Sequence, residues 1–204
     1  MTEENYNYRT SQKLLRNQFP GKGKLKIPII PKFRERPGEF DDLLLIGFDK
    51  THLEDQNYLD RMVHFFLYER VWKNPDNDIE KLSRYRAVLS PDFSMYLEMA
   101  PVMQLYNVFH NRWCGAYWAS KGLRVIPIVN WGDKSTFDFC FDGIEKGSVV
   151  AVSTYMASEH DNRQDQNEWF MAGYNEMLRR IEPEKIICYN TPFPEMQGNI
   201  IHVD

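Results

Sequence analysis

Two aspartates spaced four residues apart form the stretch of this sequence best suited to chemistry. Asp138 and Asp142 lie in the segment 137–144, where phenylalanines occupy alternate positions. A strand would place both carboxylates on one face, and a helix would bring them together at i and i+4. Paired carboxylates serve acid/base catalysis, cation coordination or contact with ligand hydroxyls. The structural alternative, one aspartate solvated and the other in a turn before Gly143, stays open, and we expect Asp142 to matter more than Asp138.

Polar and aromatic residues also follow the predicted strands. Ligands of parallel α/β sheets bind at the carboxyl ends of strands, where loops vary and helix N-termini point into the cleft. By this rule Asp92 and Asp133 join the aspartate pair as candidate catalytic residues. The candidate ligand-binding residues are Asn130, Trp131, Ser153, Thr154, Tyr155, Tyr189 and Asn190. Aromatic faces beside hydrogen-bonding groups suit a planar or sugar-like ligand, although Asp, Asn, Ser and Thr also occur there as caps and turn residues.

Apolar runs alternate with helical stretches from residue 40 onward. This pattern predicts an α/β fold with a mainly parallel sheet of five or six strands and crossover helices, either doubly wound or an incomplete barrel. The predicted strands are 43–48, 86–90, 123–129, 147–152, 185–189 and, as a sixth, 200–203. The predicted helices are 55–73, 76–85, 101–122 and 165–181. Asp49 follows the first strand and is one more polar residue at the binding edge.

The composition sets the class of protein. The chain has 204 residues, 43% hydrophobic and 14% aromatic, which excludes disordered and collagen-like classes and predicts one folded domain. No apolar run approaches the ~20 residues that a membrane helix needs, so we expect no membrane contact. Three widely spaced cysteines are typical of reduced thiols, and we expect a cytoplasmic protein.

Charge divides the chain into a basic arm and an acidic body. The net charge is −4, but residues 1–36 hold nine basic and three acidic residues. Prolines and glycines in this stretch favour extended backbone, so residues 1–39 are predicted as an arm and 40–204 as a single α/β domain. The arm either binds nucleic-acid phosphates or packs on its own domain through Ile27, Ile29, Ile30 and Phe33; we favour packing.

A resemblance to a known family rests on the segment 99–154. Its NWGD block at 130–133 and FCFDGI block at 139–144 resemble an uncharacterised domain-of-unknown-function family of bacteria, mobile elements and phages. The resemblance implies a cytoplasmic phage or mobile-element protein with nucleic acids, nucleotides or defence signals as ligands. It implies no reaction.

Two classes of function follow. The favoured one is an enzyme, a hydrolase or transferase, acting on a nucleotide-like or sugar-containing small molecule through the aspartate-rich cleft. The alternative is a non-catalytic protein that sequesters such a ligand or binds nucleic acid or a host protein. The sequence fixes neither a cofactor, a divalent cation being one option, nor an oligomeric state. His64 and His110 fall in predicted helices, and His160 with Asp161 in a predicted exposed turn, where structural roles are expected.

Overall fold

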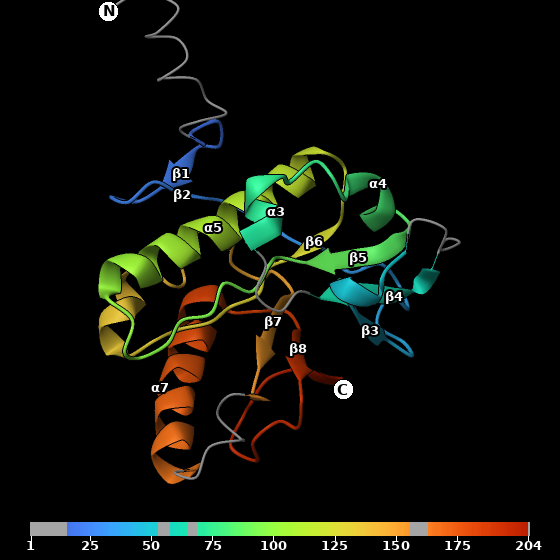
Figure 1. Cartoon of the computed structure of the whole chain (residues 1–204). Helices are drawn as coiled ribbons and strands as arrows, with labels where there is room; N and C mark the ends of the chain where they lie inside the picture. Colours follow the sequence, from blue (N-terminus) through green and yellow to red (C-terminus); the bar gives the residue numbers. More distant parts are fainter. Residues whose placement is uncertain (1–15, 53–57, 65–68, 156–162, 204) are drawn as a thin grey trace, which may run out of the picture.

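The structure is a computed structural model that describes residues 16–52, 58–64, 69–155 and 163–203. Seven parallel strands form its centre (Figure 1). They are β3 (Leu44–Gly47), β4 (Tyr58–His64), β5 (Tyr85–Leu89), β6 (Val125–Ile126), β7 (Val150–Ser153), β8 (Ile186–Tyr189) and β9 (Ile200–Val203). The helices are η1 (Phe48–Lys50), α3 (Glu69–Lys73), α4 (Ile79–Leu82), α5 (Pro101–Ser120), η2 (Lys134–Asp138) and α7 (Arg163–Ile181). This architecture confirms the predicted α/β class with a parallel sheet, but the described residues form seven parallel strands where five or six were predicted, because β4 was not among them.

The strands follow one another in space in the same order as in the chain. Strands β3 to β6 form one sheet and β7 to β9 another, each with sequential parallel pairing. A parallel bridge between Ile128 and Ala151 joins the two sheets, with the Val129 amide 2.8 Å from the Ala151 carbonyl. The order shows no reversal of the kind that defines a doubly wound sheet. Of the two predicted arrangements, the structure therefore has the incomplete barrel.

The sheet is curled, so its two halves face each other. In Figure 1 β5 runs across the view while β7 runs down it. His64 of β4 stacks on Tyr189 of β8, with ring centroids 5.5 Å apart, although three strands separate β4 from β8. Across three intervening strands, only side chains on the concave face of a curved sheet can make such a contact. Alternate residues along each strand point to that face, as in barrels.

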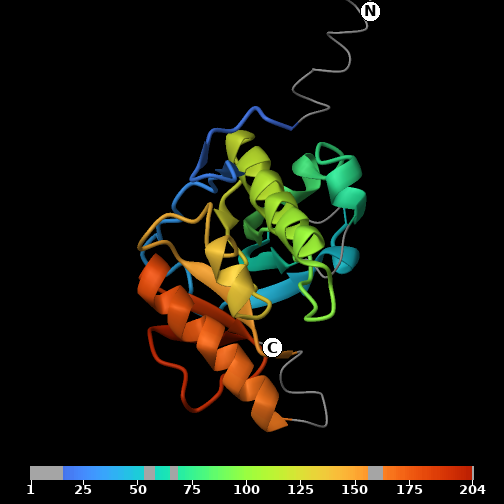
Figure 2. The ribbon, with the colours of Figure 1, turned by 90° about the vertical axis from the view of Figure 1, so that its left-hand side faces the viewer.

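Apolar side chains fill both faces of the sheet. The concave face holds Met62, Leu89, Ile126, Ala151 and Ile187. On the convex face one cluster packs β5 and β6 against α3, α4 and α5, and another packs β7 and β8 against α7. Figure 2 shows α5 and α7 lying in front of the strands. In the parts of the chain that the structure describes, no helix is long and apolar enough to span a bilayer.

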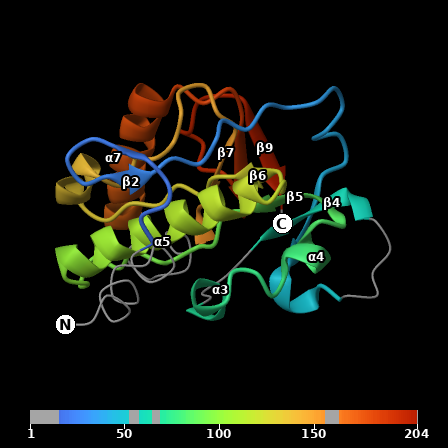
Figure 3. The same ribbon diagram turned by 90° about the horizontal axis from the view of Figure 1, so that it is seen from above.

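The arm packs against the body along residues 27–40. Of the four apolar residues predicted to pack, Ile27, Ile30 and Phe33 are buried and Ile29 is half-buried; β2 (Ile27–Pro28) pairs with β1 (Gly21–Lys22). Figure 3 shows the segment between β2 and β3 running the length of the molecule. Its amide at Phe33 donates to the Ser148 hydroxyl, just before β7. The arm thus covers the amino ends of the strands and leaves the carboxyl ends to form a site.

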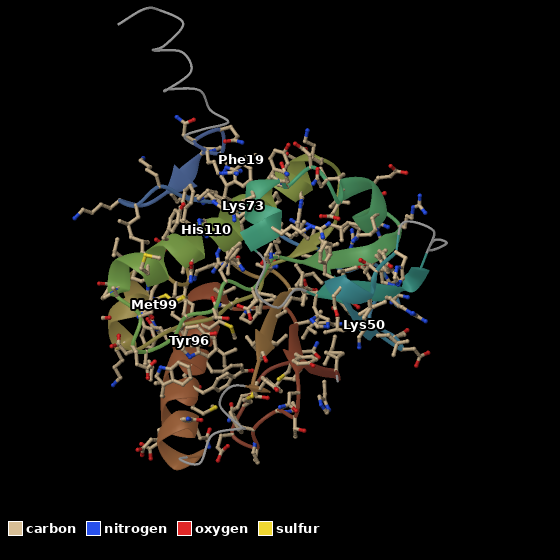
Figure 4. The ribbon with its side chains drawn as sticks, viewed as in Figure 1. Phe19, Lys50, Lys73, Tyr96, Met99 and His110 are labelled. Atoms are coloured by element: carbon tan, nitrogen blue, oxygen red, sulfur yellow. The ribbon has the colours of Figure 1, made fainter. Side chains whose placement is uncertain are left out.

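The arm is basic and the body acidic overall, yet in the described ion pairs between them the arm supplies the acids. Arg124, just before β6, forms a bidentate pair with the buried Glu39, and Lys185, just before β8, pairs with Glu35. The described pairs therefore join arm acids to body bases. Nearer the N-terminus Phe19, labelled in Figure 4, lies where α3 and α5 meet, its ring 5.9 Å from that of Trp113.

Two sequence predictions differ from the structure. The predicted helix 55–73 is wrong over 58–64, which is the strand β4, and right over Glu69–Lys73, which is α3; the rest of the predicted helix lies outside the described residues. Met62 points to the concave core and Val63 to the convex one, so at these two positions the strand is apolar on both faces and lacks alternation. The segment 137–144 is neither a strand nor an α-helix: η2 ends at Asp138 and turns follow.

Candidate functional site

A small cavity opens at the carboxyl ends of the curled sheet. Its volume is about 30 Å³, room for one or two water-sized groups. It is lined by Leu45, His64, Leu89, Asp92, Ile128, Ala151, Val152, Ser153, Ile187 and Tyr189. Five strands and the loops after them contribute, so the curl of the sheet gathers polar side chains that lie far apart in the sequence. This is where parallel barrels carry their sites.

Asp92 is the carboxylate of this cavity. It follows β5, and its Oδ1 accepts a 2.9 Å hydrogen bond from the Asn130 amide, which also donates to the Phe93 carbonyl at 3.1 Å. Loss of solvation raises the pKa of Asp92 to about 6, and the hydrogen bond from Asn130 opposes that rise only in part. Asp92 therefore exchanges a proton near neutral pH. A carboxyl group tuned in this way is suited to general acid/base chemistry.

His64 faces the same cavity from the last position of β4. Burial lowers the pKa of its imidazole, Asp49 opposes that change and Lys50 adds to it. The ring is consequently neutral at physiological pH and stacks on Tyr189. Sequence reasoning missed His64 because it assigned 58–64 to a helix. Recognition of a strand there would have placed His64 at a carboxyl end, beside Asp49.

The other predicted residues after β7 and β8 have mixed roles. Ser153 is exposed at the cavity, and its Oγ accepts from the Tyr155 amide at 3.2 Å. Thr154 is buried, and its hydroxyl donates to the Thr191 carbonyl at 2.9 Å, which ties β7 to the segment after β8. Tyr155 is exposed, and Asn190, with a φ of 67°, bonds to β9 through its backbone amide. Of this group, Ser153 and Tyr189 line the cavity.

The aspartate-rich loop lies on the convex side of the sheet. Trp131 is buried under α7, where Gly173 leaves space for its ring, and is not among the cavity-lining residues. Asp133 caps η2: its Oδ1 accepts from the hydroxyl of Ser135 at 2.6 Å and from the Ser135 amide at 2.8 Å, and these bonds hold the pKa of Asp133 low. Asp138 is exposed at the end of η2. The structure thus separates Asp133 and Asp138 from Asp92 and Asn130, which the strand-end rule had grouped together.

Asp142 sits against the arm. It is half-buried near Gly23; burial raises the pKa of its carboxyl, and the charges of Arg180 and Arg112 oppose the rise. Gly143 has a φ of 77°, and a Cβ there would lie 2.2 Å from the Pro28 carbonyl oxygen. The glycine therefore lets the arm approach this turn closely. The FCFDGI block has a structural role in docking the arm, which its spacing alone did not reveal.

Arg112 of α5 holds the same turn in place. It is fully buried, and its guanidinium donates to the backbone carbonyls of Asp142, Ile128 and Cys140 at 2.9, 3.0 and 2.8 Å. Arg112 thereby connects α5, the end of β6 and the FCFDGI turn. Among the described residues, no group of three or more His, Cys, Asp or Glu side chains could hold a metal ion.

Fold and cavity together define an α/β protein built on an incomplete parallel barrel, with a small cavity at the carboxyl edge. The chain belongs to the family described as "Domain of unknown function (DUF4417)", whose model matches residues 20–204. This match confirms the resemblance to an uncharacterised family.

Two phage proteins are similar to this chain. The "Gene 1 protein" of Mycobacterium phage D29 is 35% identical over 180 residues, which cover 86% of this chain and 64% of the relative. The "Gene 1 protein" of Mycobacterium phage L5 is 41% identical over 131 residues, which cover 62% of this chain and 56% of the relative. The chain thus spans less than two thirds of the length of either relative. No solved structure shows significant similarity to it.

Proposed function

We propose that this chain is a cytoplasmic enzyme, a hydrolase or transferase, that acts on a nucleotide-like or sugar-containing small molecule at the carboxyl-edge cavity. Asp92 is the general acid. The observation that carries the proposal is the position of Asp92, held by Asn130 at the floor of a mostly apolar cavity, with a pKa raised to about 6. A carboxyl group whose pKa is raised by burial in a cleft is typical of sites that carry out chemistry.

The lining of the cavity supports a neutral reacting group. Its polar side chains are those of His64, Asp92, Ser153 and Tyr189, and none of the described lining residues is a lysine or arginine. A phosphate would meet the Asp92 carboxylate without a compensating cation. A hydroxyl group of a sugar, or the edge of a base, suits this cavity better, because a group of that size fits it and Asp92 offers a hydrogen-bonding partner.

The proposed step is a displacement at carbon. The oxygen of water, or of an acceptor hydroxyl, forms a bond to the substrate carbon while the bond from that carbon to the leaving oxygen breaks. Asp92 gives its proton to the leaving oxygen, and the proton of the nucleophile passes to a base in the cleft. Exchange of the two protons with solvent then restores both groups. A positioned acid and base typically contribute 10²–10⁴-fold each to the rate.

The proposed location is supported by the cysteines. Cys114, Cys140 and Cys188 are all buried and unpaired, which fits a reducing compartment. The phage relatives agree with action inside a host cell, a context that we extend to this chain only as part of the proposal.

The test is a substrate screen with matched variants. The full chain is incubated with a panel of nucleosides, nucleotides, cyclic dinucleotides and sugars, and products are followed by mass spectrometry. We expect a product whose formation falls at least about 100-fold in Asp92→Asn and is kept in Asp138→Asn, an exposed aspartate outside the cavity. Recovery of an unchanged ligand, at one molecule per chain, would contradict the proposal of an enzyme and support a protein that sequesters its ligand. Loss in Asp142→Asn but not in Asp92→Asn would move the site to the FCFDGI turn.

A further inference from the structure

One inward-facing position at the carboxyl edge of the sheet has no side chain. Leu45 of β3 lines the cavity, so the alternation along the strand directs position 47 to the same concave face, and that residue is Gly47. Its partner across the ladder is His64. A glycine at an inward position leaves a space the size of a side chain next to the imidazole.

Asp49 fills this space. A Cβ built on Gly47 would lie 2.7 Å from the Asp49 Oδ1 and 3.7 Å from the His64 Nε2. Both atoms thus border the same small volume, one from η1 and one from β4. The φ of Gly47 is −64°, an angle that any residue adopts. Glycine therefore matters here because it lacks a side chain, not because its backbone is free.

We propose that His64 is the catalytic base of the cleft and that Asp49 is a positioning residue that orients its imidazole through the space at Gly47. This inference rests on the proposed function and supplies the base that the Asp92 step requires. His64 accepts the proton of the attacking hydroxyl or water, and Asp92 gives a proton to the leaving oxygen.

The charges around His64 fit this role. Asp49 favours the imidazolium that forms when the base takes a proton, whereas burial and Lys50, labelled in Figure 4, keep the ring neutral beforehand. Tyr189 stacks on the ring and Asp92 shares the cavity. A neutral base at the start of the step, with a carboxylate placed to stabilise its charged form, is the arrangement that proton abstraction needs.

A titration of His64 by NMR tests the pair without any substrate. The ring signals, assigned by comparison with His64→Asn, are followed against pH in the full chain. We expect Asp49→Asn to lower the His64 midpoint and Lys50→Met to raise it. Gly47→Ala should act like Asp49→Asn, because the added methyl group displaces the carboxylate while leaving both partners present. An unchanged midpoint in Asp49→Asn and Gly47→Ala overturns the pairing.

Turnover of the substrate found in the screen tests the catalytic role. We expect kcat to fall by about 100-fold or more in His64→Asn, with loss of the acid limb of the pH profile, and by about tenfold or more in Asp49→Asn with KM little changed. If the wild type turns over but His64→Asn keeps its rate and pH profile, this inference fails and Asp92 keeps its role. If the wild type converts nothing, the proposed function fails, and the titration alone decides the pairing.

Discussion

Replacement of Asp92 by asparagine should stabilise the protein at neutral pH. Asparagine keeps the shape of the side chain and can still accept the hydrogen bond from Asn130, but it carries no charge into the cavity. The folded state raises the pKa of Asp92 from 3.8 to about 6, so it binds a proton more tightly than the unfolded state does. The wild type therefore loses stability as pH rises from about 4 to about 6, and the variant does not.

The size of this effect follows from the shift in pKa. One pKa unit corresponds to 1.36 kcal/mol, so the full penalty on the wild type is about 3 kcal/mol above pH 7. About 2 kcal/mol of it falls between pH 4.5 and pH 7.5. The sign is that of a carboxyl group with a raised folded pKa: the penalty is absent below the unfolded value and complete above the folded one.

Urea unfolding of both proteins across this pH range measures the difference. Other titrating groups cancel because they are common to both chains, and Asp138→Asn, at an exposed position, should show a flat difference from the wild type. An Asp92→Asn difference that does not change with pH would refute the reasoning, because it would mean that the cavity does not hold a proton on Asp92.

Three further predictions concern residues outside the cavity. Arg112→Met should lower the free energy of unfolding in urea by about 3 kcal/mol or more, since it removes hydrogen bonds to three carbonyl oxygens, one buried and two part-buried; a loss below about 1 kcal/mol would contradict this. The three thiols, each with a pKa raised to about 12 by burial, should resist a thiol reagent at pH 8 until the chain is denatured, and fast labelling of the native protein would count against that burial. Removal of residues 1–26 should cost about 1–3 kcal/mol in thermal unfolding, because Phe19 and the Arg16 guanidinium, 3.9 Å from the Trp72 ring centroid, are lost. Affinity for DNA or RNA should stay weak with or without that segment; a tight, salt-sensitive complex abolished by the truncation would instead make the arm a nucleic-acid tether.

The sequence predicted the elements whose pattern is local. Helix α5 begins at the proline at 101, and β9 spans 200–203 as expected, because a first-turn proline and a short apolar run carry their own signals. Strand β4 was missed because its identity depends on partners. Burial on both faces removes the period of two, and only pairing with β3 and β5 makes the segment a strand.

The candidate site divides in the same way. Of the residues that the strand-end rule predicts, Asp92, Ser153 and Tyr189 line the cavity, and Asn130 donates a hydrogen bond to Asp92. The rule also predicts the aspartates of 133–142, which do not line the cavity, since it does not say on which face of the sheet a loop continues. That choice depends on Trp131, which fills the space at Gly173 of α7 and carries the loop to the convex side.

The most direct measurement of the central claim, that Asp92 exchanges a proton near neutral pH in the cavity, is a carbon-13 NMR titration of its side-chain carboxyl. The signal is assigned by its absence in Asp92→Asn. Our account predicts a midpoint near 6 in the full chain. A midpoint below about 4.5, in the range of an ordinary aspartate, would contradict it and leave the cavity without its acid.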